Sequence, residues 1–145
     1  MSIYFMRKII ITLLTVALIL SVGGQALALD NGYVITGDIG VQWTNTSSMD
    51  ISLDFDGSKA ICGAYIIGKI GVDKITGTVT LSRKNSDGTY TTVKTWSNIT
   101  VYDDLWTFDA IYYVSTGYRY RLTVTATVYK NGYGEVVSGY HEANA

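Results

Sequence analysis

Apolar and polar residues alternate with a period of two along most of the chain after residue 48, and this pattern restricts the fold to β-sheet. Between Met49 and Phe55 every second residue is apolar, and the residues between them are Asp or Ser. Between Tyr120 and Val128 the apolar positions alternate with Arg121 and three threonines. A period of two puts one face of a strand in a core and the other in water. The chain has no proline and is rich in Thr, Tyr, Val, Ile and Gly, which are strand and turn formers.

Seven strands are expected, separated by turn signals, and they cover residues 49–55, 60–67, 75–82, 90–96, 105–110, 118–130 and 135–140. Segment 60–67 is almost continuously apolar, which predicts a central strand buried on both faces. The clusters Asn85–Gly88 and Asn131–Gly132 predict hairpin turns. The fold class predicted is all-β, an immunoglobulin-like antiparallel sandwich of two sheets, with a small β-barrel as the alternative.

The first 28 residues have the features of a secretory signal peptide. Arg7 and Lys8 precede an apolar run over residues 9–22, and Ala26 and Ala28 meet the small-residue requirement of signal peptidase. We expect cleavage after Ala28 and release of a secreted, extracellular protein that no longer touches the membrane. The alternative is a retained anchor over residues 9–29, which is long enough to span a bilayer of about 30 Å.

The rest of the chain divides into three parts. Residues 29–48 are expected to be a partly extended N-terminal segment, residues 49–141 the sandwich domain, and residues 142–145 a polar C-terminal tail. Charged residues make up 16% of the chain and nearly balance, with 11 basic and 12 acidic side chains. This balance gives no basic patch of the kind that nucleic acids or anionic membranes attract.

Residues 113–122 resemble the start of the penultimate strand in immunoglobulin-like and fibronectin type III-like sandwiches. In those domains a tyrosine at this point packs at a corner and bonds back to the backbone. Tyr120 is the first candidate here and Tyr118 the second, against the alternative of an ordinary strand tyrosine. The immunoglobulin-type disulfide between sheets has no cysteine pair to form it.

A longer stretch of the chain resembles an uncharacterised family of small secreted all-β proteins of Gram-positive bacteria. The resemblance rests on the order of Cys62, the strand at 75–81, Thr95-Trp96-Ser97, Gly117 with Tyr120-Arg121-Leu122, Val128-Tyr129, Asn131-Gly132 and Glu135. It implies secretion from a bacterium and an all-β domain. It implies no activity and no site residues.

Cys62 is the only cysteine, so no disulfide can form within one chain. An unpaired cysteine in a secreted protein can be a reactive thiol or can bridge two molecules. Cys62 lies in the most apolar segment and shares a strand face with Ala64 and Ile66. We therefore predict that its thiol is an inert part of the core.

Catalytic groups are scarce. His141 is the only histidine, and it is expected in the polar tail, so neither a His-activated nucleophile nor a His or Cys metal site is expected. Asp103 and Asp104 are the visible carboxylate pair, but adjacent strand residues point to opposite faces, which favours a turn before Leu105. We expect no enzymatic activity and no cofactor.

Three aspartates near Gly57 are candidates for a calcium site. Asp54, Asp56 and Gly57 match part of a calcium loop, but Ser52 and Gly63 stand where ligands are required. A looser surface site could use Asp50 together with Asp54 and Asp56. We prefer a solvated carboxylate edge that discourages the addition of another strand, with no bound metal.

The aromatic side chains are more numerous than one core readily hides, with three Trp and 12 Tyr. The candidates for contact with a ligand are Tyr112, Tyr113, Trp106 and Tyr133, because aromatic rings with polar tips suit recognition surfaces. Tyr112 and Tyr113 are adjacent, so one of them faces away from the core.

The function predicted is a secreted non-catalytic module that binds a protein or a cell-wall glycan. A bacteriocin or toxin-like effector is the alternative, followed by a carboxylate-dependent hydrolase. The threonine-rich outer faces also favour a homo-oligomer.

Overall fold

A computed structural model describes residues 34–36 and 43–145 of the chain. The predicted signal peptide and most of the segment 29–48 lie outside the described residues. The described part contains the strands β1 (Val34–Thr36), β2 (Thr46–Asp56), β3 (Lys59–Gly68), β4 (Val72–Lys84), β5 (Tyr90–Val101), β6 (Leu105–Tyr113), β7 (Arg119–Lys130) and β8 (Tyr133–Asn144).

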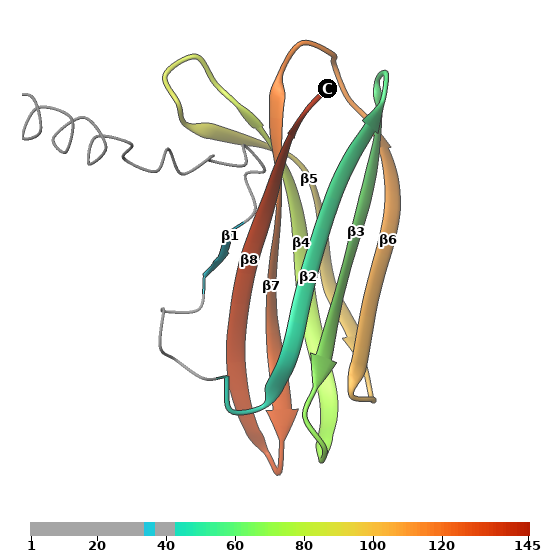
Figure 1. Ribbon diagram of the computed structural model, residues 1–145, viewed down its shortest axis with the longest axis vertical. Coiled ribbons are helices and arrows are strands. Elements are labelled where there is room, and N and C mark those ends of the chain that lie inside the picture. The colour runs from blue at the N-terminus through green and yellow to red at the C-terminus, as the bar shows by residue number, and fades with distance from the viewer. Residues whose placement is uncertain (1–33, 37–42) are drawn as a thin grey trace, which may run out of the picture. The chain divides into compact units, whose positions relative to one another are not determined.

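The strands form two antiparallel sheets that face each other (Figure 1). The small sheet has the order β2-β3-β6, and the large sheet has the order β1-β8-β7-β4-β5. Without the three-residue β1, seven long strands divide into three and four, which confirms the predicted two-sheet sandwich. Over residues 34–36 and 43–145 neither sheet closes on itself, so the barrel alternative is wrong.

The core lies between the two sheets because each strand turns its alternate apolar residues inward. Ile51 of β2, Ile66 of β3 and Leu122 of β7 are 2% exposed or less. Cys62 is 1% exposed, which confirms that it belongs to the core. Burial disfavours the thiolate and raises the pKa of the Cys62 thiol to about 11.

Strand β3 differs from its prediction. It was expected to be buried on both faces, but burial alternates along it, and Ile61, Tyr65 and Ile67 are each at least 40% exposed. The reason is its position in the small sheet, which packs against the large sheet on one face only. Within the described residues, no third layer covers the other face.

Strand β8 is longer than its prediction. Residues 142–144, expected in a polar tail, continue the strand and pair with residues 119–121 of β7. His141 therefore lies in a strand, and its Nδ1 is 3.0 Å from the backbone oxygen of Ile51 on the edge strand β2. This contact joins the small sheet to the large one.

Tyr120 is the predicted corner tyrosine. Its ring is 1% exposed and packs against Phe55, with 5.5 Å between the ring centroids. Its hydroxyl donates a 2.7 Å hydrogen bond to the backbone oxygen of Ser115, five residues upstream. This geometry confirms the corner and fixes the loop between β6 and β7.

The pairing of β4 with β5 is interrupted twice. The register shifts between Gly77 and Val79 and again between Leu81 and Ser82. At the first shift Asn98 of β5 has a positive φ of 56°. Gly77 is required there because a Cβ atom would lie 2.5 Å from the ring of Trp106 on the opposite sheet. The Trp106 indole N–H donates a 2.9 Å bond to the backbone oxygen of Ile99, which anchors the ring between the sheets.

Candidate functional site

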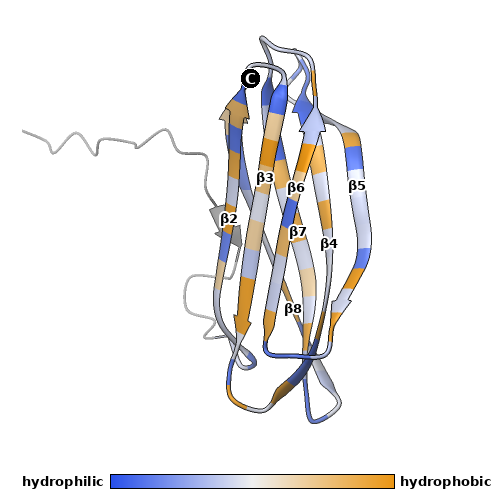
Figure 2. Ribbon diagram, turned by 90° about the vertical axis from the view of Figure 1, so that its right-hand side faces the viewer, coloured by the Kyte–Doolittle hydropathy of each residue, from blue (hydrophilic) through white to orange (hydrophobic). Residues whose placement is uncertain are grey.

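The outward surface of β2, β3 and β6, here called the small-sheet face, exposes several large apolar side chains to solvent. Those that are at least 40% exposed are Ile61, Tyr65, Ile67, Leu105, Ile111 and Tyr113. Ile67 lies opposite Leu105 in the β3–β6 register, and Ile61 lies opposite Ile111. Figure 2 shows the corresponding hydrophobic bands on neighbouring strands. Large apolar side chains exposed together on one sheet face are typical of interaction sites.

A polar row crosses the middle of the small-sheet face. Ser52, Gly63 and Asp109 are register partners on β2, β3 and β6. A Cβ atom on Gly63 would lie 2.6 Å from the Ser52 hydroxyl oxygen and 3.7 Å from the Asp109 carboxylate. The missing side chain therefore leaves room for these two polar groups. Beside them a shallow hollow of about 360 Å³ is lined in part by Ile61, Asp109 and Ile111.

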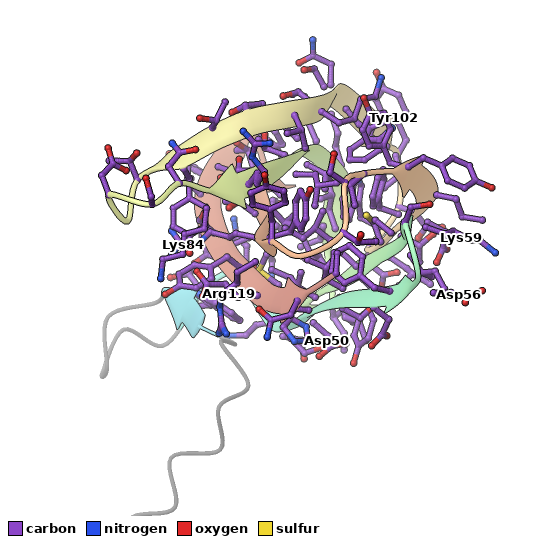
Figure 3. All side chains as sticks on the ribbon, turned by 90° about the horizontal axis from the view of Figure 1, so that it is seen from above. Asp50, Asp56, Lys59, Lys84, Tyr102 and Arg119 are labelled. Carbon is purple, nitrogen blue, oxygen red and sulfur yellow. The ribbon has the colours of Figure 1, made fainter. Side chains whose placement is uncertain are left out.

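The two sheets carry opposite charge. Residues 43–71 and 102–116, which form the small sheet and its turns, contain six aspartates and two lysines. The remaining residues 72–101 and 117–145 contain seven basic and four acidic side chains. Asp50, Asp54 and Asp109 lie on the small-sheet face itself, and Figure 3 shows Asp50 and Asp56 along this sheet. Aspartates therefore border the apolar surface along β2 and interrupt it at Asp109.

The predicted contact tyrosines lie in different places. Tyr113 is 71% exposed on the small-sheet face, and Tyr133 is 80% exposed at the start of β8, on the large sheet. Tyr112 is half-buried and meets the Trp96 ring edge-on, with 6.2 Å between centroids. The prediction that one of the adjacent pair faces outward is confirmed, and the outward residue is Tyr113.

Trp106 does not reach the surface, so its prediction as a ligand contact is wrong. It is fully buried and stacks on Phe108 at 6.3 Å, in the space that Gly77 leaves open. In β6 the outward positions are instead Leu105, Thr107 and Asp109. The sequence did not predict that Leu105 and the β3 residues Ile61 and Ile67 are exposed, because apolar residues in strands are expected to be buried.

The carboxylates expected as alternatives do not converge. Asp50 and Asp54 are four residues apart on one strand, which corresponds to about 13 Å and is too far for one ion. In the part of the chain that the structure describes, no group of three or more His, Cys, Asp or Glu side chains could hold a metal. Asp103 accepts a 2.7 Å bond from the backbone N–H of Asp104 in the turn before β6, which confirms the turn interpretation.

Glu142 is the centre of a charged cluster on the outer face of the large sheet that the sequence did not predict. Its carboxylate accepts bonds of 2.8 Å from Arg119 Nε and 2.7 Å from Arg121 Nε, and another from the Tyr90 hydroxyl. The Arg121 guanidinium lies 3.9 Å from the ring centroid of Tyr90 and 4.1 Å from that of Tyr140. Burial alone would raise the pKa of Glu142, but these hydrogen bonds outweigh it and lower the pKa to about 2.

Comparison with known proteins adds little to this geometry. No protein-family model matches the chain, and no curated protein matches it. Among solved structures, it is similar to the sporulation control protein Spo0M from Bacillus subtilis at 13% sequence identity, with a TM-score of 0.43. The match covers 70% of this chain and 50% of that protein, so the chain spans about half its length. Across the described residues, no helix combines the length and apolarity that crossing a membrane requires.

Proposed function

We propose that the chain is exported and acts as a non-catalytic binding module, whose small-sheet face docks on a partner protein. The observation that carries the proposal is the set of six large apolar side chains exposed on one sheet face. Such a face gains free energy when it is covered, at about 25 cal/mol per Å² of apolar area. The partner surface that fits has apolar residues with Lys or Arg between and beside them, because Asp109 lies in the middle of the small-sheet face and Asp50 and Asp54 lie along its β2 edge.

The composition of this face favours a protein over a glycan. Four of its six exposed apolar residues are Ile or Leu, which offer neither a ring for sugar stacking nor a hydrogen bond. Its two exposed rings, Tyr65 and Tyr113, lie at separate register positions. Exposed tyrosines beside aliphatic and charged side chains are typical of protein interfaces.

The charge of this face disfavours a second copy stacked on it symmetrically. In a two-fold contact the same patch meets itself. Asp50, Asp54 and Asp109 of both copies would then lie in one interface, and buried like charges oppose association. A partner with basic residues at its rim meets no such cost.

Site-specific crosslinking tests this proposal. A photoreactive residue at position 111 reports on the small-sheet face, and one at position 136 is the matched control, because Val136 is a 67% exposed apolar residue on the large sheet. We expect a defined protein adduct from position 111 in the source culture and none from position 136. Excess unlabelled wild-type chain should compete with this adduct, whereas the Ile111→Lys variant should not.

Three outcomes would contradict the proposal. The first is equal adducts from both positions, and the second is an adduct with the chain itself. The third is the absence of any protein adduct together with retention of the chain on purified cell-wall glycan that Ile111→Lys abolishes.

Export has its own test. If the predicted signal peptide is removed after Ala28, mass spectrometry of the culture medium should find Leu29 at the N-terminus. Recovery of the intact chain from the membrane fraction alone would instead indicate an anchor over residues 9–29.

A further inference from the structure

A basic pocket of about 460 Å³ opens at the end of the sandwich where the β4–β5 hairpin meets the β6–β7 loop. It is lined by Arg83 and Lys84 at the end of β4, by Tyr118 of the loop and by Arg119 at the start of β7. Figure 3 shows Lys84 and Arg119 together on the side of the molecule away from Asp56. This pocket is separate from the small-sheet face.

Among the described residues that line the pocket there are three cations and no carboxylate. Two acidic side chains lie beside the lining, one near it in the sequence and one that contacts Arg119. Asp87 in the hairpin turn accepts bonds from the backbone N–H and hydroxyl of Thr89, and Glu142 binds Arg119 from outside the lining. The three cations of the lining outnumber these two carboxylates, so the field in the pocket is positive and favours an anion.

The two arginines are held in place before any ligand binds. The Arg83 guanidinium lies 4.7 Å from the centre of the Tyr118 ring, and Glu142 fixes Arg119 through its Nε. The loop is held by a 2.8 Å bond from Gly117 N to Ala145 O and a 3.0 Å bond from Ala145 N to Tyr118 O. Side chains that are already ordered lose less entropy when they bind.

We propose that this pocket binds a phosphate-type oxyanion, either as the free ion or as the phosphodiester unit of an anionic polymer. Arginine presents a planar fork that pairs with two oxygens of one phosphate, and lysine adds a compact charge. Two arginines and one lysine match an anion with several oxygens better than they match a single carboxylate. The inference is independent of the small-sheet face and of its partner.

Titration followed by amide NMR tests the site, with inorganic phosphate and a glycerol phosphate oligomer as probes at constant ionic strength. We expect saturable shifts in residues 83–86 and 117–119. Arg83→Ala should weaken binding about ten-fold, the value of one charged hydrogen bond. The affinity of Arg83→Lys should lie between those of the wild type and Arg83→Ala, because lysine keeps the charge and lacks the planar guanidinium. If inorganic phosphate and the oligomer bind with equal affinity per phosphate, the free ion is sufficient as the ligand. If the oligomer binds more tightly, the ligand is an anionic polymer.

The matched control is Lys130→Ala, which removes one charge at the opposite end of β7 and should leave the affinity unchanged. The amide spectrum of Arg83→Ala shows whether that variant keeps the fold. If it does not, Lys84→Ala provides a second test, because the Lys84 side chain is exposed. The proposal is overturned if neither probe gives saturable shifts in this region. It is also overturned if Lys130→Ala weakens binding as much as the pocket variants do.

Discussion

Replacing Glu142 by Gln should remove a pH-dependent part of the stability. Only the ionised carboxylate attracts Arg119 and Arg121, and the Gln side chain imitates the protonated form. One pKa unit corresponds to about 1.4 kcal/mol, so a fall from 4.5 to about 2 makes ionised Glu142 worth about 3 kcal/mol. Its side chain is 10% exposed, so screening by solvent takes little from this figure.

The sign follows from the direction of the pKa change. The pKa of Glu142 is lower in the folded chain, so its contribution is complete above about pH 5 and is lost as the pH falls towards 2. The difference between wild type and Glu142→Gln should therefore be about 3 kcal/mol at pH 7 and should approach zero near pH 2. The measurement is the free energy of unfolding in urea, which unlike guanidinium adds no salt to screen the charges.

Two comparisons make this test decisive. Asp56→Asn removes one carboxylate outside the cluster and should cost much less than Glu142→Gln at pH 7. Glu135 should leave some acid dependence in both variants, because hydrogen bonds from Thr44 and Thr46 outweigh the effect of burial and lower its pKa. If the loss in Glu142→Gln were the same from pH 7 to pH 2, packing rather than charge would account for it, and the reasoning would be refuted.

Three further substitutions test the core. Tyr120→Phe should lower the free energy of unfolding by about 0.5 to 1.5 kcal/mol, because it removes the bond to Ser115; a neutral result would show that the corner bond adds nothing. Gly77→Ala should cost about 1 to 3 kcal/mol by overpacking against Trp106, and unchanged urea midpoints would contradict this packing. Cys62 should resist thiol reagents until the chain unfolds, and Cys62→Ser should cost about 1 to 3 kcal/mol. Rapid labelling of the native protein, or a disulfide-linked dimer, would contradict the prediction that the Cys62 thiol is inert.

The strands were predictable because alternation is a local property, and the corner was predictable because Tyr120 and its partner Ser115 are five residues apart. Which apolar face lies inward was harder to predict. In β6 the polar residues Thr107 and Asp109 mark the outward face, but room for the Trp106 ring on the inward face depends on the gap beside Gly77 on a strand of the other sheet.

The two candidate sites depend on contacts between distant parts of the chain. Ile61 and Ile67 look like core residues until the sheet order shows that no described element covers one face of β3. Glu142 lies 23 residues from Arg119, and they meet only because β8 continues beyond Tyr140. The one local signal for this cluster was the spacing of Arg119 and Arg121, which puts two cations on the same strand face.

The two irregularities of β5 have a consequence for how these molecules behave at high concentration. β5 is an edge of the large sheet, and an unprotected edge offers its backbone groups to a strand of another molecule. Between the register shifts only Lys94, Thr95 and Trp96 pair with β4 in regular succession. Bulges bend and twist a strand, so an incoming strand finds no long straight template there. A chain without proline, the usual residue that blocks strand addition, thus uses backbone geometry to keep this edge from growing into a fibril.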